Sequence, residues 1–289
     1  MSVEQLSATL TKDQAYALVD AVMERDDLAL TASAHEIEET GEWVFEAACD
    51  GPPNLQAFSD LAQQVLGGTV EFSVEKLDPD INWVAKSLEG LAPVIAGGFY
   101  VYGSHEEGPI PEGLTPMKID AAQAFGTGHH ETTTGCLEAI EMLLTRTTPK
   151  AMIDVGTGTG VLAIALAKRL GGSILATDID PIAVTTTIEN AEENGVGENI
   201  VSIEATGLDH ADITARAPYD LIVANILAGP LTELAPGMGG IAAPGGTAIL
   251  SGILNTQADG VIAAYELAGF RLVEHLKRKE WTTLLLEKR

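Results

Sequence analysis

The segment AMIDVGTGTGVLAIALAKRL, residues 151–170, contains the clearest pattern for predicting the fold of the larger part of the chain. A short apolar run typical of a strand leads into a glycine turn, and an apolar helical pattern follows directly. Asp178 ends the next predicted strand, 22 residues after Gly156. Glycines in such a turn let a ligand approach the backbone amides, and ligands of open parallel sheets bind at the carboxyl ends of the strands. We therefore expect Gly156, Gly158 and Asp178 to line a site for a nucleotide, with Asp178 accepting hydrogen bonds from ribose hydroxyls.

The chain beyond residue 150 continues this alternation of strands and helices. Further strands are predicted at SILATDI, NIVSIEA, DLIVAN and TAILSGI. Repeated βα units predict a parallel sheet with helices on both faces. The last two strand-like runs, RLVEHLKRKE and WTTLLLEKR, have no helix between them and should pair antiparallel. We therefore expect an α/β class fold, a doubly wound Rossmann-like sheet with a closing antiparallel strand.

The first 77 residues have a different pattern. A helix is predicted at 11–26, two strands at LALTASAHEIEE and EWVFEAACD, a second helix at 54–66 and a strand at TVEFSVEKL. Helix, two strands, helix and strand predict a small α+β domain of ferredoxin-like type. The segment contains no chemical motif, so recognition is its expected role. Residues 78–119 are expected to be a connector, with a helix at 82–91, a strand at GFYVYGS and an exposed hinge at EEGPIPEGLTP.

Charge and cysteine content limit the function classes. The chain has 16 basic and 42 acidic residues, a net charge of −26. Such a surface repels phosphate backbones, which disfavours tight nucleic-acid binding, and attracts a basic partner; an acidity that serves only solubility or a salty habitat is the open alternative. Two cysteines exclude a disulfide framework, and neither a signal peptide nor a membrane-spanning stretch is evident, so we expect a cytoplasmic protein without membrane partners.

The glycine turn alone does not select one cofactor. Gly158, Gly160 and Ala163 also satisfy the dinucleotide fingerprint, so a nicotinamide-dependent oxidoreductase is a competing interpretation. Two features besides the closing antiparallel pair favour a methyltransferase. Asp154 directly precedes the glycines, where an acid can hold the loop and the amine of a bound methionine moiety. Asn225 ends the strand DLIVAN, where methyltransferases place an Asn or Asp beside the reaction centre.

For Asn225, and likewise for Asp178, capping of the following helix is the structural alternative.

A second glycine-rich stretch, AFGTGHHETTT at 124–134, precedes a helix predicted to start between residues 132 and 134. We expect this stretch to form a lid, with Phe125 packed over the cofactor and Gly126 in contact with it. Two adjacent histidines without a matching cluster do not indicate a metal site.

Four motifs in order, AFGTGHHETT, IDVGTGTGVLAIA, TDIDP and ANILAGPLTELAP, resemble the bacterial family that methylates the eleventh protein of the large ribosomal subunit. The resemblance covers the chain from about residue 80, while the N-terminal region matches only in pattern and size. It implies that Thr133, Gly156, Asp178 and Asn225 contact S-adenosylmethionine. It also implies that the N-terminal domain binds the basic ribosomal protein and that lysine and N-terminal amines are methylated.

These expectations combine into one working hypothesis. Residues 1–77 recognise the substrate, 78–119 connect, and 120–289 form the methyltransferase domain. Because the methyl donor is already activated, the protein mainly aligns donor and acceptor, and the side chain or carbonyl of Asn225 is expected to accept a hydrogen bond from the incoming amine. A methyltransferase of another protein or of a small molecule and a non-catalytic acidic binding module are the remaining alternatives.

Overall fold

A computed structural model of the chain describes residues 3–23, 25, 28–29, 31–37, 41–76, 93–104, 106, 108–120 and 130–289. The chain divides into two compact units, Met1–Lys86 and Ser87–Arg289. The helix predicted at 82–91 lies outside the described residues. Among the helices that are described, none is long and apolar enough to cross a membrane.

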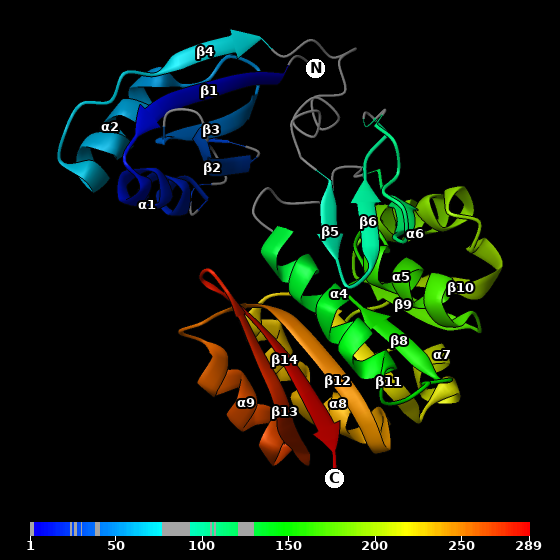
Figure 1. Cartoon of the computed structure of the whole chain (residues 1–289). Coiled ribbons are helices and arrows are strands. Elements are labelled where there is room, and N and C mark those ends of the chain that lie inside the picture. Colours follow the sequence, from blue (N-terminus) through cyan, green and yellow to red (C-terminus); the bar gives the residue numbers. More distant parts are fainter. Residues whose placement is uncertain are drawn as a thin grey trace. The chain divides into compact units, whose positions relative to one another are not determined.

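The first unit is a four-stranded antiparallel sheet with two helices (Figure 1). Its sheet has the order β2-β3-β1-β4, and α1 and α2 contact each other. The sequence βαββαβ with this strand order is the ferredoxin-like arrangement. Leu6, Leu18, Phe45 and Phe58 are fully buried in its core, which also contains Cys49. The elements are β1 (Val3–Leu10), α1 (Lys12–Met23), β2 (Thr31–Ile37), β3 (Glu42–Asp50), α2 (Leu55–Leu66) and β4 (Ser73–Lys76).

Strand β1 is absent from the predicted pattern, which was wrong to begin with the helix. The strand is central, since it pairs antiparallel with both β3 and β4. Its inward positions are Glu4, Leu6 and Ala8, and Glu4 is only 7% exposed. A buried glutamate and a small alanine weaken the alternation of apolar and polar residues by which a strand is identified.

The second unit begins with a three-stranded sheet of order β5-β6-β7, formed by β5 (Val94–Ala96), β6 (Phe99–Tyr102) and β7 (Thr115–Lys118). These strands lie within the predicted connector, and β6 coincides with the strand expected at GFYVYGS. Phe99 and Met117 are fully buried in one cluster with side chains of α4 (His130–Leu144), among them Cys136. This packing makes residues 94–118 part of the second unit, which extends further toward the N-terminus than the predicted start at residue 120.

The main sheet of the second unit has seven strands in the order β10-β9-β8-β11-β12-β14-β13. Strand β14 runs opposite to the other six, since it pairs antiparallel with both β12 and β13, which confirms the doubly wound sheet with a closing antiparallel strand. The elements are β8 (Met152–Val155), α5 (Val161–Leu170), β9 (Ile174–Asp178), α6 (Pro181–Glu193), β10 (Ile200–Glu204), α7 (Ala211–Arg216), β11 (Tyr219–Asn225), α8 (Ala228–Ile241), β12 (Ala242–Leu254), α9 (Ala258–Leu267), β13 (Phe270–Arg278) and β14 (Trp281–Lys288), with a 3-10 turn at Gly197–Asn199.

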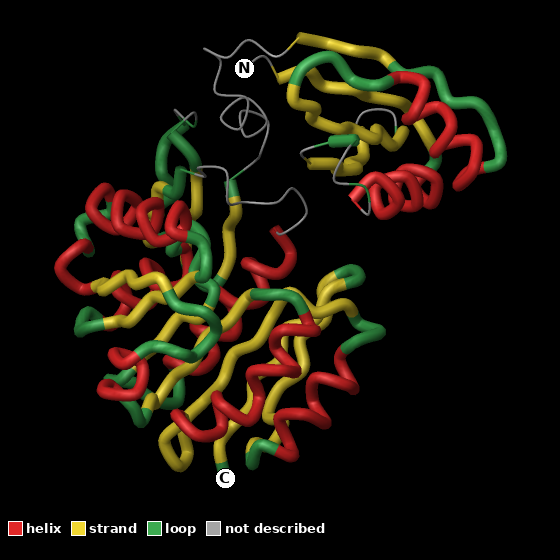
Figure 2. Tube along the Cα trace, turned by 180° about the vertical axis from the view of Figure 1, so that it is seen from behind, coloured by secondary structure: helices red, strands yellow, loops and turns green. Residues whose placement is uncertain are grey.

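Helices cover both faces of this sheet (Figure 2). One apolar cluster joins the sheet to α4, α5 and α6, and a second joins it to α7, α8 and α9. The strand order changes direction between β8 and β11. In open α/β sheets, the carboxyl ends of the strands at such a point form a ligand crevice. This topology directs attention to the residues that follow β8, β9 and β11.

Candidate active site

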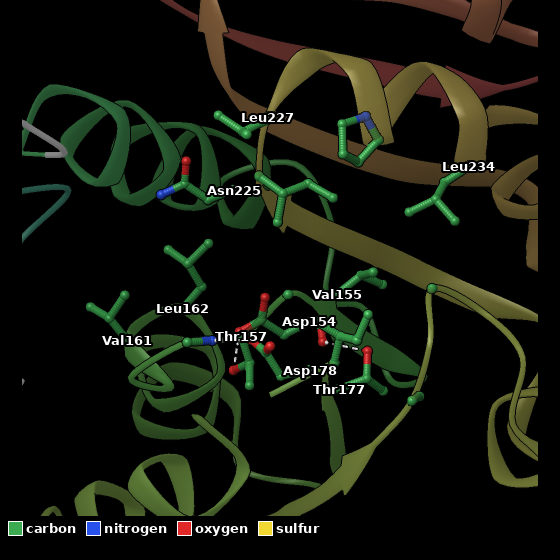
Figure 3. Close-up of a pocket in the computed structure, with 17 residues that line it drawn as sticks. Asp154, Val155, Thr157, Val161, Leu162, Thr177, Asp178, Asn225, Leu227 and Leu234 are labelled. Atoms are coloured by element: carbon green, nitrogen blue, oxygen red, sulfur yellow. Dashed lines mark hydrogen bonds between the residues drawn. The ribbon is translucent and has the colours of Figure 1, made fainter. Parts of the chain in front are cut away.

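A cavity of about 460 Å³ lies at the carboxyl ends of β8, β9 and β11 (Figure 3). Its walls come from the glycine turn after β8, the end of β9 and the segment that follows β11. The volume falls within the range of small-molecule and cofactor sites. Five of the eight predicted site residues line it: Asp154, Gly156, Gly158, Asp178 and Asn225.

The glycine turn depends on backbone angles and space that other residues lack. Gly156, Gly158 and Gly160 have φ angles of 72°, 58° and 82°. A Cβ atom at Gly156 would collide with the side chain of Ile226. At Gly158 a Cβ would meet no described atom within 4 Å, so there is room over this residue. The turn therefore presents open backbone at Gly158, which lines the cavity.

Asp154 is a buried carboxylate with one unused oxygen. It is 1% exposed, and its Oδ2 accepts hydrogen bonds from the Thr157 hydroxyl (2.8 Å) and the Ala163 amide (3.2 Å). Oδ1 has no hydrogen-bond partner among the described residues. Burial, with a smaller contribution from the nearby Asp178, raises the pKa of Asp154 to about 7, although the two hydrogen bonds act to lower it. Because Asp154 lines the cavity, its free oxygen suits a positively charged ligand group.

Asp178 is fixed by two backbone amides. Its Oδ2 accepts from the amide of Gly158 (2.9 Å) and its Oδ1 from that of Asp180 (3.0 Å). Asp180, and not Asp178, caps α6, because its side chain accepts from the Ile182 amide (2.8 Å). A carboxylate oxygen can accept more than one hydrogen bond, so Asp178 retains acceptor capacity toward the cavity.

Asn225 ends β11 on the other side of the cavity from Asp154, Thr157 and Asp178 (Figure 3). Its Oδ1 is buried and lacks a partner within the described part of the chain. The N-cap of α8 is Leu227. The capping role considered for Asn225 is therefore not the one the structure shows, and its amide oxygen is free for a ligand.

The remaining three predicted residues are not placed in the cavity wall. Thr133 lies in the first turn of α4, which begins at His130, two residues before the predicted range. It is buried, and its hydroxyl has no partner among residues the structure describes, but it does not line the cavity. Phe125 and Gly126 lie outside the described residues, so their contacts stay predictions.

Sequence reasoning missed the apolar members of the wall. Ile179 and Leu227 line the cavity and are 65% and 66% exposed, large fractions for aliphatic side chains. Each follows closely after a polar residue that ends a strand, Asp178 or Asn225. A large apolar residue within two positions after a polar strand end is the signal that would have found them, because exposed apolar surface at a cavity mouth indicates ligand contact.

Comparison with known proteins gives concordant results. The family model for ribosomal protein L11 methyltransferase (PrmA) matches residues 3–289. Proteins named ribosomal protein L11 methyltransferase from Brucella suis and Chelativorans sp. are 45% and 43% identical, and each alignment covers 95% of this chain and 95% or 94% of the relative. A crystal structure of a ribosomal protein L11 methylase from Lactobacillus delbrueckii subsp. bulgaricus superposes with a TM-score of 0.58 at 30% identity, covering 66% of this chain and 94% of that one.

Proposed function

The chain belongs to the ribosomal protein L11 methyltransferase family, and on this premise we propose that it transfers methyl groups from S-adenosylmethionine to lysine and N-terminal amines of ribosomal protein L11. The resemblance read from the four motifs is thereby confirmed. Because the family match begins at residue 3, it also includes the N-terminal region, which resembled the family only in pattern and size. Membership of this family argues against the two alternative functions considered above, a nicotinamide-dependent oxidoreductase and a non-catalytic binding module.

The observation that best supports this proposal is that the residues of the cavity wall fit S-adenosylmethionine. S-adenosylmethionine, when bound, supplies an activated methyl group on a positively charged sulfur. Asp154 offers a buried, unpartnered carboxylate oxygen to a positive group, and Asp178 offers an oriented carboxylate to ribose hydroxyls. Gly158 provides the open backbone, and Ile179 an apolar surface for the base. We further assign Gly156 to the turn that contacts the cofactor, and Thr133 to the contacts that the family resemblance implies. Phe125 and Gly126 remain proposed as cofactor contacts of the expected lid.

Asn225 is the proposed catalytic residue. A lysine amine has a pKa of about 10.4 and attacks only when neutral. Exposed apolar groups at the cavity mouth, such as Leu227, desolvate an incoming amine and so lower its pKa. The unpartnered Oδ1 of Asn225 then accepts a hydrogen bond from the neutral amine and orients its lone pair. Holding donor and acceptor together in the reactive geometry can lower a barrier by roughly 7–11 kcal/mol in total, and the hydrogen bond to Asn225 supplies a part of this.

The first unit is the proposed docking surface for the protein substrate. Residues 1–86 contain 17 acidic and 4 basic residues, a net charge of −13, which is half the charge of the chain in less than a third of its length. Such a domain attracts a basic partner and does so less strongly at high salt. A ribosomal protein as partner also implies that the enzyme works in the cytoplasm.

The test is transfer of label from S-adenosylmethionine to purified L11, followed by mass spectrometry of the modified amines. We expect labelled L11, and a KM for L11 that rises with salt. Asp178→Ala should lower transfer at least 100-fold, because it loses the ribose contacts and the hold on Gly158. Asp180→Ala is the matched control: it removes the α6 cap, with a cost of about 1 kcal/mol in stability, and should retain transfer. Unlabelled L11 with the unmodified enzyme would refute the proposal.

A further inference from the structure

Helix α6 carries a polar stripe on a buried face. Thr187, Asn190 and Asn194 are three and four residues apart and therefore share one side of the helix. Thr187 is fully buried and Asn190 is 3% exposed. Buried polar side chains are costly unless hydrogen-bonded, so the partners of this stripe reveal its role.

Asn190 joins two segments that are 39 residues apart. Its Nδ2 donates to the carbonyl oxygen of Thr159 in the glycine turn (2.9 Å) and to that of Asp120 (3.1 Å). Its Oδ1 accepts from the amide of Asp120 (3.1 Å). The side-chain amide thus bonds to both the backbone amide and the carbonyl oxygen of Asp120, and it also bonds to the glycine turn. Three of its four hydrogen-bonding positions are in use.

The two neighbouring members of the stripe each make one of these two kinds of contact: Thr187 bonds to the glycine turn, and Asn194 bonds to the end of β7. Thr187 donates to the carbonyl oxygen of Gly158 (3.1 Å), whose amide is held by Asp178. Asn194 accepts from the amide of Lys118 (3.1 Å) and donates to its carbonyl oxygen (2.6 Å). Outside its own helix, Asn194 therefore bonds only to Lys118 at the end of β7, whereas Asn190 bonds both to Asp120, just after β7, and to the glycine turn.

We propose that Asn190 is a positioning residue for cofactor binding: it links the peptide group after Thr159 to the backbone of Asp120, just after β7, and so holds the glycine turn in its binding shape. A peptide unit is planar, so fixing its carbonyl also fixes the amide of the next residue. The inference rests on the proposed function insofar as S-adenosylmethionine binds at this turn. Asn190 itself does not line the cavity and acts through the turn.

The experiment compares Asn190→Ala with Asn194→Ala in the full chain. Each variant loses three side-chain hydrogen bonds, since Nδ2 of Asn194 also donates to the Asn190 carbonyl, and both should lower the melting temperature. We expect Asn190→Ala to weaken S-adenosylmethionine binding about tenfold or more by calorimetry, and Asn194→Ala to change it less than twofold. Asn190→Asp provides a second variant: it keeps the acceptor for the Asp120 amide but loses the Nδ2 donations to the carbonyl oxygens of Thr159 and Asp120, so it should also weaken binding.

The outcomes separate the two hypotheses. Cofactor affinity that is unchanged in both Asn190 variants, or lowered equally in the Asn194 variant, would show a merely structural role and overturn the inference, while the proposed function stands. If the unmodified protein binds no S-adenosylmethionine, the proposed function fails, and the inference fails with it. Loss of affinity confined to the Asn190 variants would support it.

Discussion

Replacing Asp154 by asparagine tests whether its unpartnered oxygen serves a positive charge. Asparagine has nearly the same shape, and its Oδ1 can accept the two hydrogen bonds that Thr157 and Ala163 now donate. The substitution therefore removes chiefly the ionisable charge. The pKa of Asp154 rises from an ordinary 3.8 to about 7 in the fold, and one pKa unit corresponds to about 1.4 kcal/mol. Ionised Asp154 thus costs the fold roughly 4 kcal/mol when no cation compensates it.

The sign of the stability effect follows from proton linkage. Between pH 4 and 7, roughly, the folded protein keeps a proton on Asp154 that the unfolded chain releases, so the free energy of unfolding falls as pH rises through this window. Above pH 7 the full cost is present. Asp154→Asn removes it but leaves an amide Nδ2 without a partner, at about 1–3 kcal/mol. The variant without cofactor should be about 1–3 kcal/mol more stable than the unmodified protein at pH 8, measured by chemical denaturation.

Cofactor affinity should respond in the opposite sense to stability: it should rise with pH, and it should fall in Asp154→Asn. If a positive group of S-adenosylmethionine needs ionised Asp154, affinity falls toward tenfold per pH unit below pH 7, which is about 30-fold at pH 5.5. Calorimetry of both proteins from pH 5.5 to 8.5 measures this, and the variant corrects for titration of the cofactor itself. We expect weak binding without that pH dependence in Asp154→Asn. Equal affinity of the two proteins at pH 7.5, or parallel pH profiles, would refute the reasoning.

Two further substitutions test the other walls of the cavity. Asn225→Ala should lower turnover on L11 roughly 10- to 100-fold at saturating cofactor, since one hydrogen bond to the reacting amine is lost, while steady-state kinetics should show an S-adenosylmethionine KM within about threefold; unchanged turnover would dismiss the side-chain role. Gly156→Ala should lower the free energy of unfolding by about 1–3 kcal/mol and also weaken cofactor binding, because the new Cβ meets Ile226 at a positive φ. Gly171→Ala is the control: its φ is similar, but its Cβ would meet no described atom within 4 Å, so it should lower the free energy of unfolding only through backbone strain. Equal cofactor affinity in the two variants would contradict a collision between the Cβ added at Gly156 and Ile226.

The main sheet was predictable because its strands are apolar runs that end in turn residues. Parallel strands bring their carboxyl ends to one edge, so the sequence alone predicts that Asp154, Asp178 and Asn225 lie close together. Strand β1 was not predictable, since Glu4 occupies an inward position. Strands β5 and β7 were also missed, because they have only three and four residues, too few for an alternating pattern to be recognised, whereas β6 was predicted at GFYVYGS.

The role of Asn190 could not be inferred from its surroundings in the sequence. A polar residue on a helix normally lies on the solvated face, and nothing local distinguishes Asn190 from such a residue. Its function depends on Asp120 and Thr159, which approach it only in the folded chain. The raised pKa of Asp154 has the same origin, because it depends on burial by distant segments.

Each of the two units encloses one cysteine, Cys49 in the first and Cys136 in the second, and the chain has no others. Burial raises the pKa of both thiols, so neither reacts until its surroundings open. Alkylation followed by peptide mass spectrometry therefore reads the transient opening of each unit separately in one unlabelled sample. The two cysteines thus report whether the protein substrate or the nucleotide cofactor protects the first or the second unit from opening.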